Sequence, residues 1–242
     1  VLCGSGQLAV PVFHAIRRSG HELLRVITQP ARPAGRGGKP RPTPLSEAAA
    51  AEGLAATELE NVNAPDALAM LRDDRPEAIC VVDFGQFIRK AARGAAGRSA
   101  FNLHASLLPA LRGAAPVNWA ILRGHGRTGV TTFELVDRMD AGPIYVQKAV
   151  DIRPDQTAED LREALGALGA EAVCETLALL EAGRAEPRPQ DESLATLAPM
   201  LEKADGVIDW TAPAPAVRNR IHGTWPWPGG QAVCHGRGGK SQ

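Results

Sequence analysis

Asn102 and His104 lie two residues apart in the apolar segment from Phe101 to Pro109. Because side chains alternate along an extended strand, residues at i and i+2 project from the same face. The carboxamide is then a fixed hydrogen-bond donor and the imidazole a titratable base, side by side at a strand end. Chemistry at a carbonyl needs such a pair, one group for the developing oxyanion and one for a proton. Asp140, in the turn-like sequence Met-Asp-Ala-Gly, adds a carboxylate as a third partner.

The elements that must position these residues alternate along the chain. We expect strands over residues 1–3, 23–28, 78–83, 130–135 and 144–150, and helices over residues 9–18, 45–52, 65–74 and 161–180. Alternating strands and helices are typical of an α/β fold with a mostly parallel, helix-covered sheet. The last two strands are expected to pair around Asp140.

Length and composition predict a globular protein with one sizeable α/β domain and a smaller appendage. The chain has 242 residues, of which 44% are hydrophobic, enough for a substantial core. No apolar run approaches the roughly 18 residues of a membrane-spanning helix. The first apolar segment has no basic region before it, which argues against a signal peptide. The four cysteines are widely spaced, which predicts buried thiols in a reducing cytoplasm.

One short segment concentrates positive charge, although the chain as a whole is neutral with 27 basic and 27 acidic residues. Residues 32–41 contain no acid and four cations, which are Arg32, Arg36, Lys39 and Arg41. Prolines and glycines surround them, so residues 29–44 are expected to form a loop. A solvated loop is one interpretation, and a loop that contacts phosphates is the one we favour.

The sequence GSGQLA at residues 4–9 fits a dinucleotide-binding fingerprint between an expected strand and an expected helix. That fingerprint also needs an acid at the end of the second strand to hold a ribose. The second strand ends in Ile-Thr-Gln at residues 27–29, without such an acid. A glycine-permitted turn is therefore the better interpretation, and a non-catalytic nucleotide-binding module is kept as an alternative.

Several motifs together resemble those of the folate-dependent formyltransferases. They are N-x-H-x-S-L-L-P at residues 102–109, R-G-A-A-P at 112–116, T-G-V-T at 128–131 and D-x-G at 140–142. Residues 28–37, with the sequence TQPARPAGRG, resemble the basic loop of the methionyl-tRNA formyltransferases, a branch of this family in which the loop touches initiator tRNA. The likeness runs from residue 1 to about Gly229, with departures such as Gly6 where the family usually has proline.

The resemblance implies formyl transfer from 10-formyltetrahydrofolate, as co-substrate, to the α-amine of methionine on initiator tRNA, with no metal. Asn102 would donate to the oxyanion, His104 would stabilise it or accept the amine's proton, and Asp140 would hold His104 in its working tautomer. The folate would contact Phe84, Gly85, Gln86, Ser106, Leu107, Leu108, Pro109 and Gly142. The tRNA would contact Arg32, Arg36, Lys39 and Arg41. We expect the protein to be a cytoplasmic monomer.

The resemblance also implies the domain organisation. A Rossmann-like catalytic domain is expected over residues 1–186, a linker over 187–204, and the truncated start of a small C-terminal β-barrel, which serves tRNA binding in the family, over 205–242. The chain stops where the strands of that barrel should begin. Trp225 and Trp227, which lie between prolines, are interpreted as packing anchors.

A formyltransferase acting on an amino-sugar nucleotide or another small primary amine is the alternative function. Such an enzyme would share Asn102, His104 and Asp140 but would not need the basic loop. Cys234 and His235 are only two adjacent ligand types, so no zinc site is expected.

Overall fold

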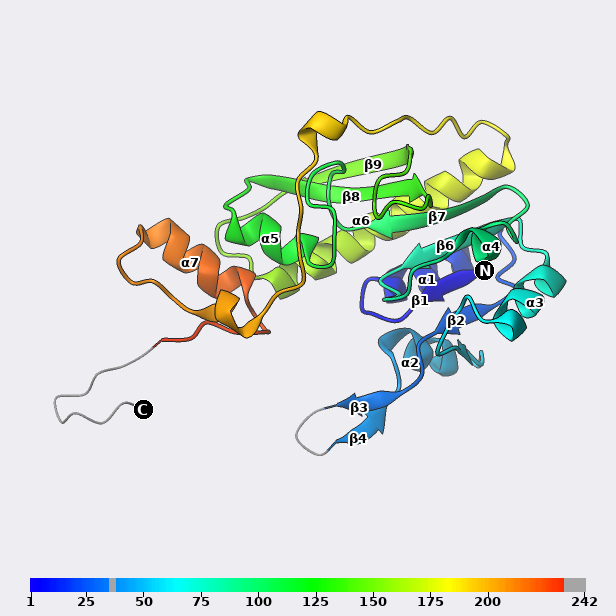
Figure 1. The fold of residues 1–242 in the computed structure, drawn as a ribbon, viewed down its shortest axis with the longest axis horizontal. Coiled ribbons are helices and arrows are strands. Elements are labelled where there is room, and N and C mark those ends of the chain that lie inside the picture. Colours follow the sequence, from blue (N-terminus) through cyan, green and yellow to red (C-terminus); the bar gives the residue numbers. More distant parts are fainter. Residues whose placement is uncertain (35–37, 233–242) are drawn as a thin grey trace.

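A computed structural model describes residues 1–34 and 38–232 of the chain. Its main feature is a seven-stranded sheet with the order β5-β2-β1-β6-β7-β8-β9, and a separate two-stranded sheet pairs β3 with β4 (Figure 1). The strands are β1 (Leu2–Gly4), β2 (Val26–Thr28), β3 (Arg32–Ala34), β4 (Lys39–Arg41), β5 (Thr57–Glu58), β6 (Ala78–Val82), β7 (Ser99–His104), β8 (Arg127–Glu134) and β9 (Ile144–Asp151).

Within the described residues, seven α-helices and two short 3-10 helices connect and cover the strands. The α-helices are α1 (Ala9–Arg18), α2 (Pro44–Ala51), α3 (Pro65–Asp74), α4 (Lys90–Arg93), α5 (Pro116–Leu122), α6 (Ala158–Glu181) and α7 (Ala214–Gly223), and the 3-10 helices are η1 (Glu192–Leu194) and η2 (Lys203–Gly206). The predicted bounds of α1 and α3 are confirmed.

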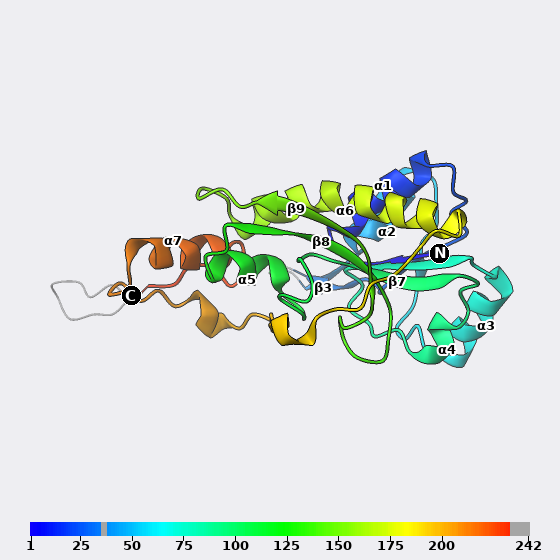
Figure 2. The same ribbon diagram turned by 90° about the horizontal axis from the view of Figure 1, so that it is seen from above.

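Two apolar layers enclose the sheet, one on each face. Cys80 and Val82 of β6 pack with α1, α2 and α6, whereas Ile79 and Val81 of the same strand pack with α3 and α4. This alternation follows from the period of two along a strand and explains why a central strand is apolar throughout. Figure 2 shows the two helix layers on opposite sides of the sheet.

The strand directions confirm the expected fold class. Strands β5, β2, β1, β6 and β7 are mutually parallel, and β8 and β9 run antiparallel at one edge. The strands β8 and β9 pair around the turn of Asp140 as predicted. The strand predicted over residues 23–28 begins only at Val26. Its first paired position is Val26 opposite Leu2 of β1, because β1 itself begins at Leu2 and has no residue paired with Leu23 to Arg25.

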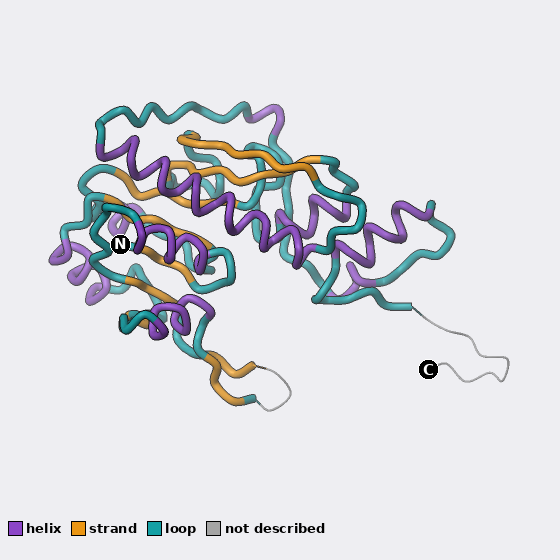
Figure 3. The backbone as a smooth tube through the Cα atoms, turned by 180° about the vertical axis from the view of Figure 1, so that it is seen from behind, coloured by secondary structure: helices purple, strands orange, loops and turns teal. Residues whose placement is uncertain are grey.

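The prediction of a loop over residues 29–44 is wrong in part. Its described residues form an antiparallel hairpin in which Arg32 pairs with Arg41 and Ala34 with Lys39. The hairpin follows β2 and projects away from the main sheet (Figure 3). Prolines occupy opposed positions 33 and 40 of these two strands, and proline is tolerated where a strand has a free edge.

The segment after α6 passes beside β9, where Arg188 forms a bridge with Ile144, and then reaches α7. Helix α7 packs against α5, and the Asn118 side chain donates to the Gly223 carbonyl at 2.8 Å. The expectation that both tryptophans of the following segment are packing anchors is not met, since Trp225 and Trp227 are 51% and 53% exposed. The indole N–H of Trp225 donates to Glu159 at 3.1 Å.

The described residues contain no helix that is both long and apolar enough to cross a membrane. Cys3 and Cys80 are buried as expected, and burial raises the pKa of Cys3 to about 12. Cys174 is half-buried on α6, and Cys234 and His235 lie outside the described residues.

Candidate active site

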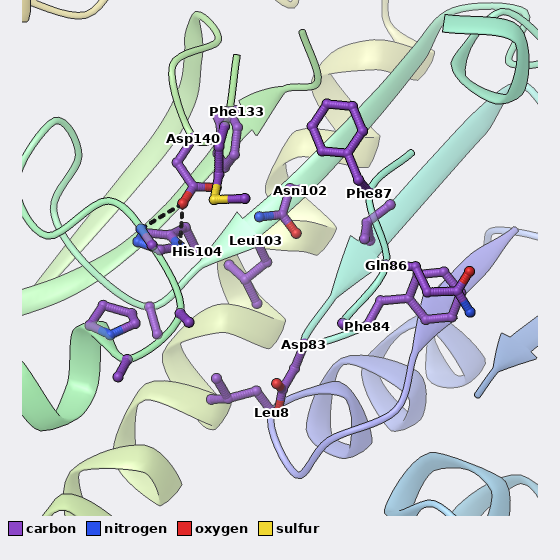
Figure 4. A pocket seen from close by; sticks show the side chains of 18 of the residues that line it. Leu8, Asp83, Phe84, Gln86, Phe87, Asn102, Leu103, His104, Phe133 and Asp140 are labelled. Carbon is purple, nitrogen blue, oxygen red and sulfur yellow. Dashed lines mark hydrogen bonds and ion pairs between the residues drawn. The ribbon is translucent and has the colours of Figure 1, made fainter. Parts of the chain in front are cut away.

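Strand β7 brings Asn102 and His104 to the wall of one cavity. Both residues are at the carboxyl end of the strand, where Asn102 is opposite Val81 of β6 and His104 is opposite Thr131 of β8. The cavity has a volume of about 530 Å³, and Figure 4 shows both side chains directed into it. Its size is typical of sites for small organic ligands.

The Leu111 carbonyl fixes the protonation pattern of the His104 ring. Nε2 of His104 lies 2.8 Å from this carbonyl oxygen, which is only an acceptor, so we assign the proton of the neutral ring to Nε2. Nδ1 is left with its lone pair and lies 3.8 Å from Oδ2 of Asp140. At this distance Asp140 forms no direct hydrogen bond with the ring, so we assign the tautomer from the Leu111 contact, and the role of Asp140 toward His104 stays a prediction.

Asp140 is held in place by the backbone of the preceding loop. Its Oδ2 accepts a hydrogen bond of 2.8 Å from the Gly113 N–H, and its carbonyl oxygen accepts one from Gln190. Asp140 has a φ of 52°, and Gly113 has a φ of 123°. A side chain at Gly113 would also meet the Ala198 carbonyl at 2.6 Å, which explains this glycine of the R-G-A-A-P motif.

These positions define what the three side chains can do. In the described part of the chain, no protein group hydrogen-bonds to the Asn102 side chain, so its N–H donors are available to a molecule bound in the cavity. The lone pair on Nδ1 of His104 can accept a proton, and the imidazolium so formed lies between the Leu111 carbonyl and the Asp140 carboxylate. The arrangement supplies an oxyanion donor beside a base whose charged form is stabilised.

A second wall of the cavity comes from the segment after β6 and includes Phe84, Gly85 and Gln86, whose contact with folate stays a prediction. The Gln86 carboxamide is already used, since it accepts from the Val62 N–H and donates to the Leu59 carbonyl, both at 2.8 Å. A side chain at Gly85, whose φ is 72°, would meet Nε2 of Gln29 at 2.5 Å. The segment is therefore a rigid wall rather than a source of free polar side chains.

The other residues proposed to bind folate do not line this cavity. They are Ser106, Leu107, Leu108, Pro109 and Gly142. The Ser106 hydroxyl donates to the Ala110 carbonyl at 2.6 Å, and Leu108 is buried against Phe133 and Ile144. These contacts show that the turn packs against the protein next to His104. A direct contact between the turn and folate stays a prediction.

Several residues that line the cavity were not found from the sequence. Met139 and Met200 are 62% and 74% exposed there, and Asn118 and Arg162 reach the same space from α5 and α6. Met139 directly precedes Asp140, which was identified from the sequence, so its position next to Asp140 could have suggested that Met139 also lines the cavity. Met200, Asn118 and Arg162 come from distant segments and carry no local signal.

Asp83 explains why the glycine-rich turn at residues 4–9 differs from a dinucleotide site. The N–H groups of Ser5 and Gly6 both donate to the Asp83 carbonyl, at 3.1 and 3.0 Å. A Cβ at Gly6 would overlap the Asp83 carboxylate, which lies against this turn and close to the Leu8 N–H. Although Asp83 opens onto the cavity, desolvation by the surrounding protein raises the pKa of its carboxyl. A carboxylate thus lies where a dinucleotide would place its phosphates.

Three of the four cations proposed to bind tRNA lie within the described residues. Lys39 and Arg41 are two positions apart on β4 and share a face, and Arg32 is directly opposite Arg41. All three are exposed, and Arg32 lies 3.3 Å from Glu60. Arg36 lies outside the described residues. The hairpin therefore gathers positive charge on one face, and it follows the carboxyl end of β2.

No group of three or more His, Cys, Asp or Glu side chains within residues 1–34 and 38–232 could hold a metal ion. The cavity instead combines apolar walls with the carboxamide, imidazole and carboxylate described above. This donor set suits a neutral organic ligand with a reactive carbonyl better than a cation.

Comparisons with known proteins place the chain in a family. The family model described as "Formyl transferase" matches residues 1–177, and that of "Formyl transferase, C-terminal domain" matches residues 200–240. The methionyl-tRNA formyltransferase of Solibacter usitatus is 43% identical over 237 residues, covering 98% of this chain and 76% of the relative. The methionyl-tRNA formyltransferase of Heliobacterium modesticaldum is 42% identical over 98% of this chain and 75% of the relative.

Solved structures show the same fold at low sequence identity. An N-formyltransferase from Helicobacter canadensis, in complex with folinic acid and dTDP-3-aminofucose, matches with a TM-score of 0.68 and 18% identity, covering 92% of this chain and 78% of that one. HypX from Aquifex aeolicus, in complex with tetrahydrofolic acid, matches with a TM-score of 0.62 and 22% identity, covering 76% of this chain and 32% of that one.

Proposed function

The chain belongs to the formyl transferase family, among the methionyl-tRNA formyltransferases, and we propose that it transfers a formyl group from 10-formyltetrahydrofolate to the α-amine of methionine on initiator tRNA. The observation that carries this proposal is the meeting of Asn102, His104 and Asp140 at one cavity. These three residues come from two segments almost 40 positions apart in a chain that is 43% identical to a methionyl-tRNA formyltransferase.

The three residues act on a carbonyl and an amine held in the cavity. When the amine adds to the formyl carbon, negative charge grows on the formyl oxygen, and the Asn102 N–H groups donate to it. The amine loses a proton to Nδ1 of His104, and Asp140 stabilises the imidazolium at 3.8 Å. His104 then returns that proton to the leaving nitrogen as the bond between carbon and leaving nitrogen breaks.

The folate co-substrate supplies an activated formyl group, and this chain offers it a cavity with rigid apolar walls. We place it against Phe84, Gly85 and Gln86, which line the cavity. Two solved structures that share the fold were determined with folinic acid and with tetrahydrofolic acid, which supports a folate as the ligand. The turn from Ser106 to Pro109, together with Gly142, would contribute to this site indirectly. These residues would fix the positions of His104 and Asp140, which line the cavity.

The hairpin of β3 and β4 is proposed to contact the phosphates of the tRNA acceptor stem. Arg32, Arg36, Lys39 and Arg41 would orient the tRNA so that its aminoacyl end reaches the cavity. The region from residue 205 onward belongs to the C-terminal domain of the family and would add to the same surface. We place the domain boundaries near residues 186 and 205.

The decisive experiment is formylation of methionyl-tRNA by this chain with 10-formyltetrahydrofolate as donor. The wild-type chain is compared with His104→Ala, and with His14→Ala as a control, because His14 lies on α1 and bonds to Glu52 at 2.6 Å. We expect formylated product with the wild type and His14→Ala and none above background with His104→Ala. Product formation that is equal in all three would exclude His104 from the reaction.

An amino-sugar nucleotide offered as acceptor in the same assay tests the alternative function, since the Helicobacter canadensis protein was solved with dTDP-3-aminofucose. Transfer to the sugar but not to methionyl-tRNA would replace the proposed acceptor. Transfer to methionyl-tRNA that depends on the hairpin cations would exclude the alternative.

A further inference from the structure

A second cavity of about 720 Å³ adjoins the catalytic cavity. Four residues line both spaces and mark the passage between them, and they are Ala115, Asn118, Arg162 and Met200. The second cavity lies between α1 and α6, and its apolar wall includes Val10 and Pro11 of α1 and Leu201. These four shared residues are distant in sequence from the wall of residues 84–86, and no residue of that wall lines the second cavity.

The outer wall of this second cavity is formed by Pro226 and Trp227, far from α1 in the sequence. Two hydrogen bonds fix the segment that carries them. Asn118 donates to the Gly223 carbonyl at 2.8 Å, and the Trp225 indole donates to Glu159 of α6 at 3.1 Å. The Trp225 indole thus links the segment to α6 through one surface hydrogen bond, while the neighbouring Trp227 remains 53% exposed at the cavity.

An indole that is half-exposed beside an apolar cavity offers a flat surface for an aromatic ring. Stacking of a nucleobase on such a side chain requires no particular base and strengthens binding substantially. The polar groups at the rim are Gln7, Glu159 and Glu163, with Arg162 between the two acids in sequence. Two carboxylates at the rim suit the amino and hydroxyl donors of a nucleoside and disfavour a diphosphate.

We propose that this second cavity binds the aminoacyl end of the acceptor, with the 3′-terminal nucleoside stacked on Trp227 and the amino acid directed through the passage. The inference rests on the proposed function, because the transfer needs a place for the acceptor beside the place for the formyl donor. The apolar lining accepts an uncharged side chain such as that of methionine, and the passage at Met200 leads the α-amine to His104.

The test compares Trp227→Ala and Trp227→Phe with Trp210→Ala. Trp210 is a matched control, since it lies in the same C-terminal region, is 62% exposed and lines neither cavity. We expect Trp227→Ala to raise the KM for methionyl-tRNA about tenfold or more, with the KM for 10-formyltetrahydrofolate unchanged. Trp227→Phe keeps an aromatic face and should recover most of the loss, and Trp210→Ala should behave like the wild type.

Direct binding separates this inference from the proposed function. The probe is a non-hydrolysable amide that joins methionine to 3′-amino-3′-deoxyadenosine, titrated by calorimetry against each variant. Weaker binding to Trp227→Ala than to Trp210→Ala supports the cavity assignment even if turnover is absent. A Kd within twofold of the wild type in Trp227→Ala, or an equal loss in Trp210→Ala, overturns it. Formylation of methionyl-tRNA by the wild type with an unchanged KM in Trp227→Ala would retain the function and reject this cavity.

Discussion

The two ends of the parallel strands are built in different ways. At the carboxyl ends, β1 leads into the turn at residues 4–9, β2 into the hairpin, β6 into the wall at Phe84 and β7 into the loop after His104. At the amino ends, Arg25 before β2 forms two hydrogen bonds with Asp74, of 2.5 and 2.7 Å. Arg98 before β7 donates to Glu77 at 2.8 Å and to the Leu180 carbonyl at 3.0 Å.

This difference shows how the fold separates stability from chemistry. The carboxyl ends diverge into a cavity, and residues with positive φ are concentrated there, at Asp83, Leu111 and Asp140. Side chains such as Asn102 keep free hydrogen-bonding groups at this end, whereas the ion pairs of Arg25 and Arg98 at the amino ends line no part of the cavity. Ligands of open α/β sheets bind at the carboxyl ends for the same topological reason. Substitutions at the two ends should therefore affect different measurements.

The largest effect is expected from Asn102→Ala. Loss of the oxyanion donor should lower kcat by about 10²–10³-fold, while the free energy of unfolding stays close to that of the wild type, because the carboxamide bonds to ligand rather than to protein. Asn102→Asp has almost the same shape without N–H donors and should be equally impaired. Single-turnover formylation and urea unfolding measure the two properties. An active Asn102→Asp variant would rule out the donor role.

A smaller loss of turnover is expected from Asp140→Asn. The amide can still accept the bond from the Gly113 N–H, so the loop is retained, but the charge beside the His104 imidazolium is removed. We expect kcat to fall roughly 10–100-fold, less than the full contribution of a positioned base. Asp137→Asn is the control, because this acid of the same loop is 80% exposed and pairs with Arg93. Equal kcat values in the two variants would contradict a role of Asp140 in charge stabilisation.

Substitutions in the hairpin should change the KM for methionyl-tRNA and its dependence on salt concentration rather than kcat. Neutralising Lys39 and Arg41 together is expected to raise the KM for methionyl-tRNA about tenfold at low salt and to reduce the slope of log KM against log salt by on the order of 1 per cation. The KM for folate should not change. Arg18→Ala with Arg72→Ala removes two exposed cations near the amino ends and should leave the KM and the slope unaltered. A similar change in both pairs would indicate a non-specific charge effect.

The sequence predicts which side chains gather at the carboxyl ends of the strands better than it predicts the backbone contacts and the hairpin around them. Asn102, His104 and Asp140 could be identified from side-chain types and spacing, because strand alternation and the β8–β9 turn are local properties. The partner of His104 could not, because the Leu111 carbonyl is a backbone group placed by a φ of 61°. The hairpin was missed because short strands containing proline lack an alternating apolar pattern. The exposure of Trp227 depends on the packing of α7 against α5, which no local pattern specifies.

The smallest effect is expected from Asp74→Asn. This substitution tests whether the amino ends of the strands contribute to stability rather than to catalysis. The hydrogen bonds from Arg25 hold the pKa of the Asp74 carboxyl below its ordinary value of 3.8 in the folded protein. A carboxyl whose folded-state pKa is lowered stabilises the fold at pH values above the ordinary pKa, and this contribution disappears as pH falls through the lowered value. Because the pair lies near solvent, its contribution at pH 7 is about 1 kcal/mol or less.

The Asp74→Asn variant should therefore unfold at a lower urea concentration than the wild type at pH 7, and the difference should shrink as pH falls below about 4. Its kcat and both KM values should equal those of the wild type, since Asp74 lies at the opposite end of the strands from the cavity. A stability difference that persists unchanged in acid would mean that Arg25 and Asp74 contribute through packing rather than charge. A loss of kcat without loss of stability would mean that the two ends are not independent, and that the amino ends also position Asn102 and His104.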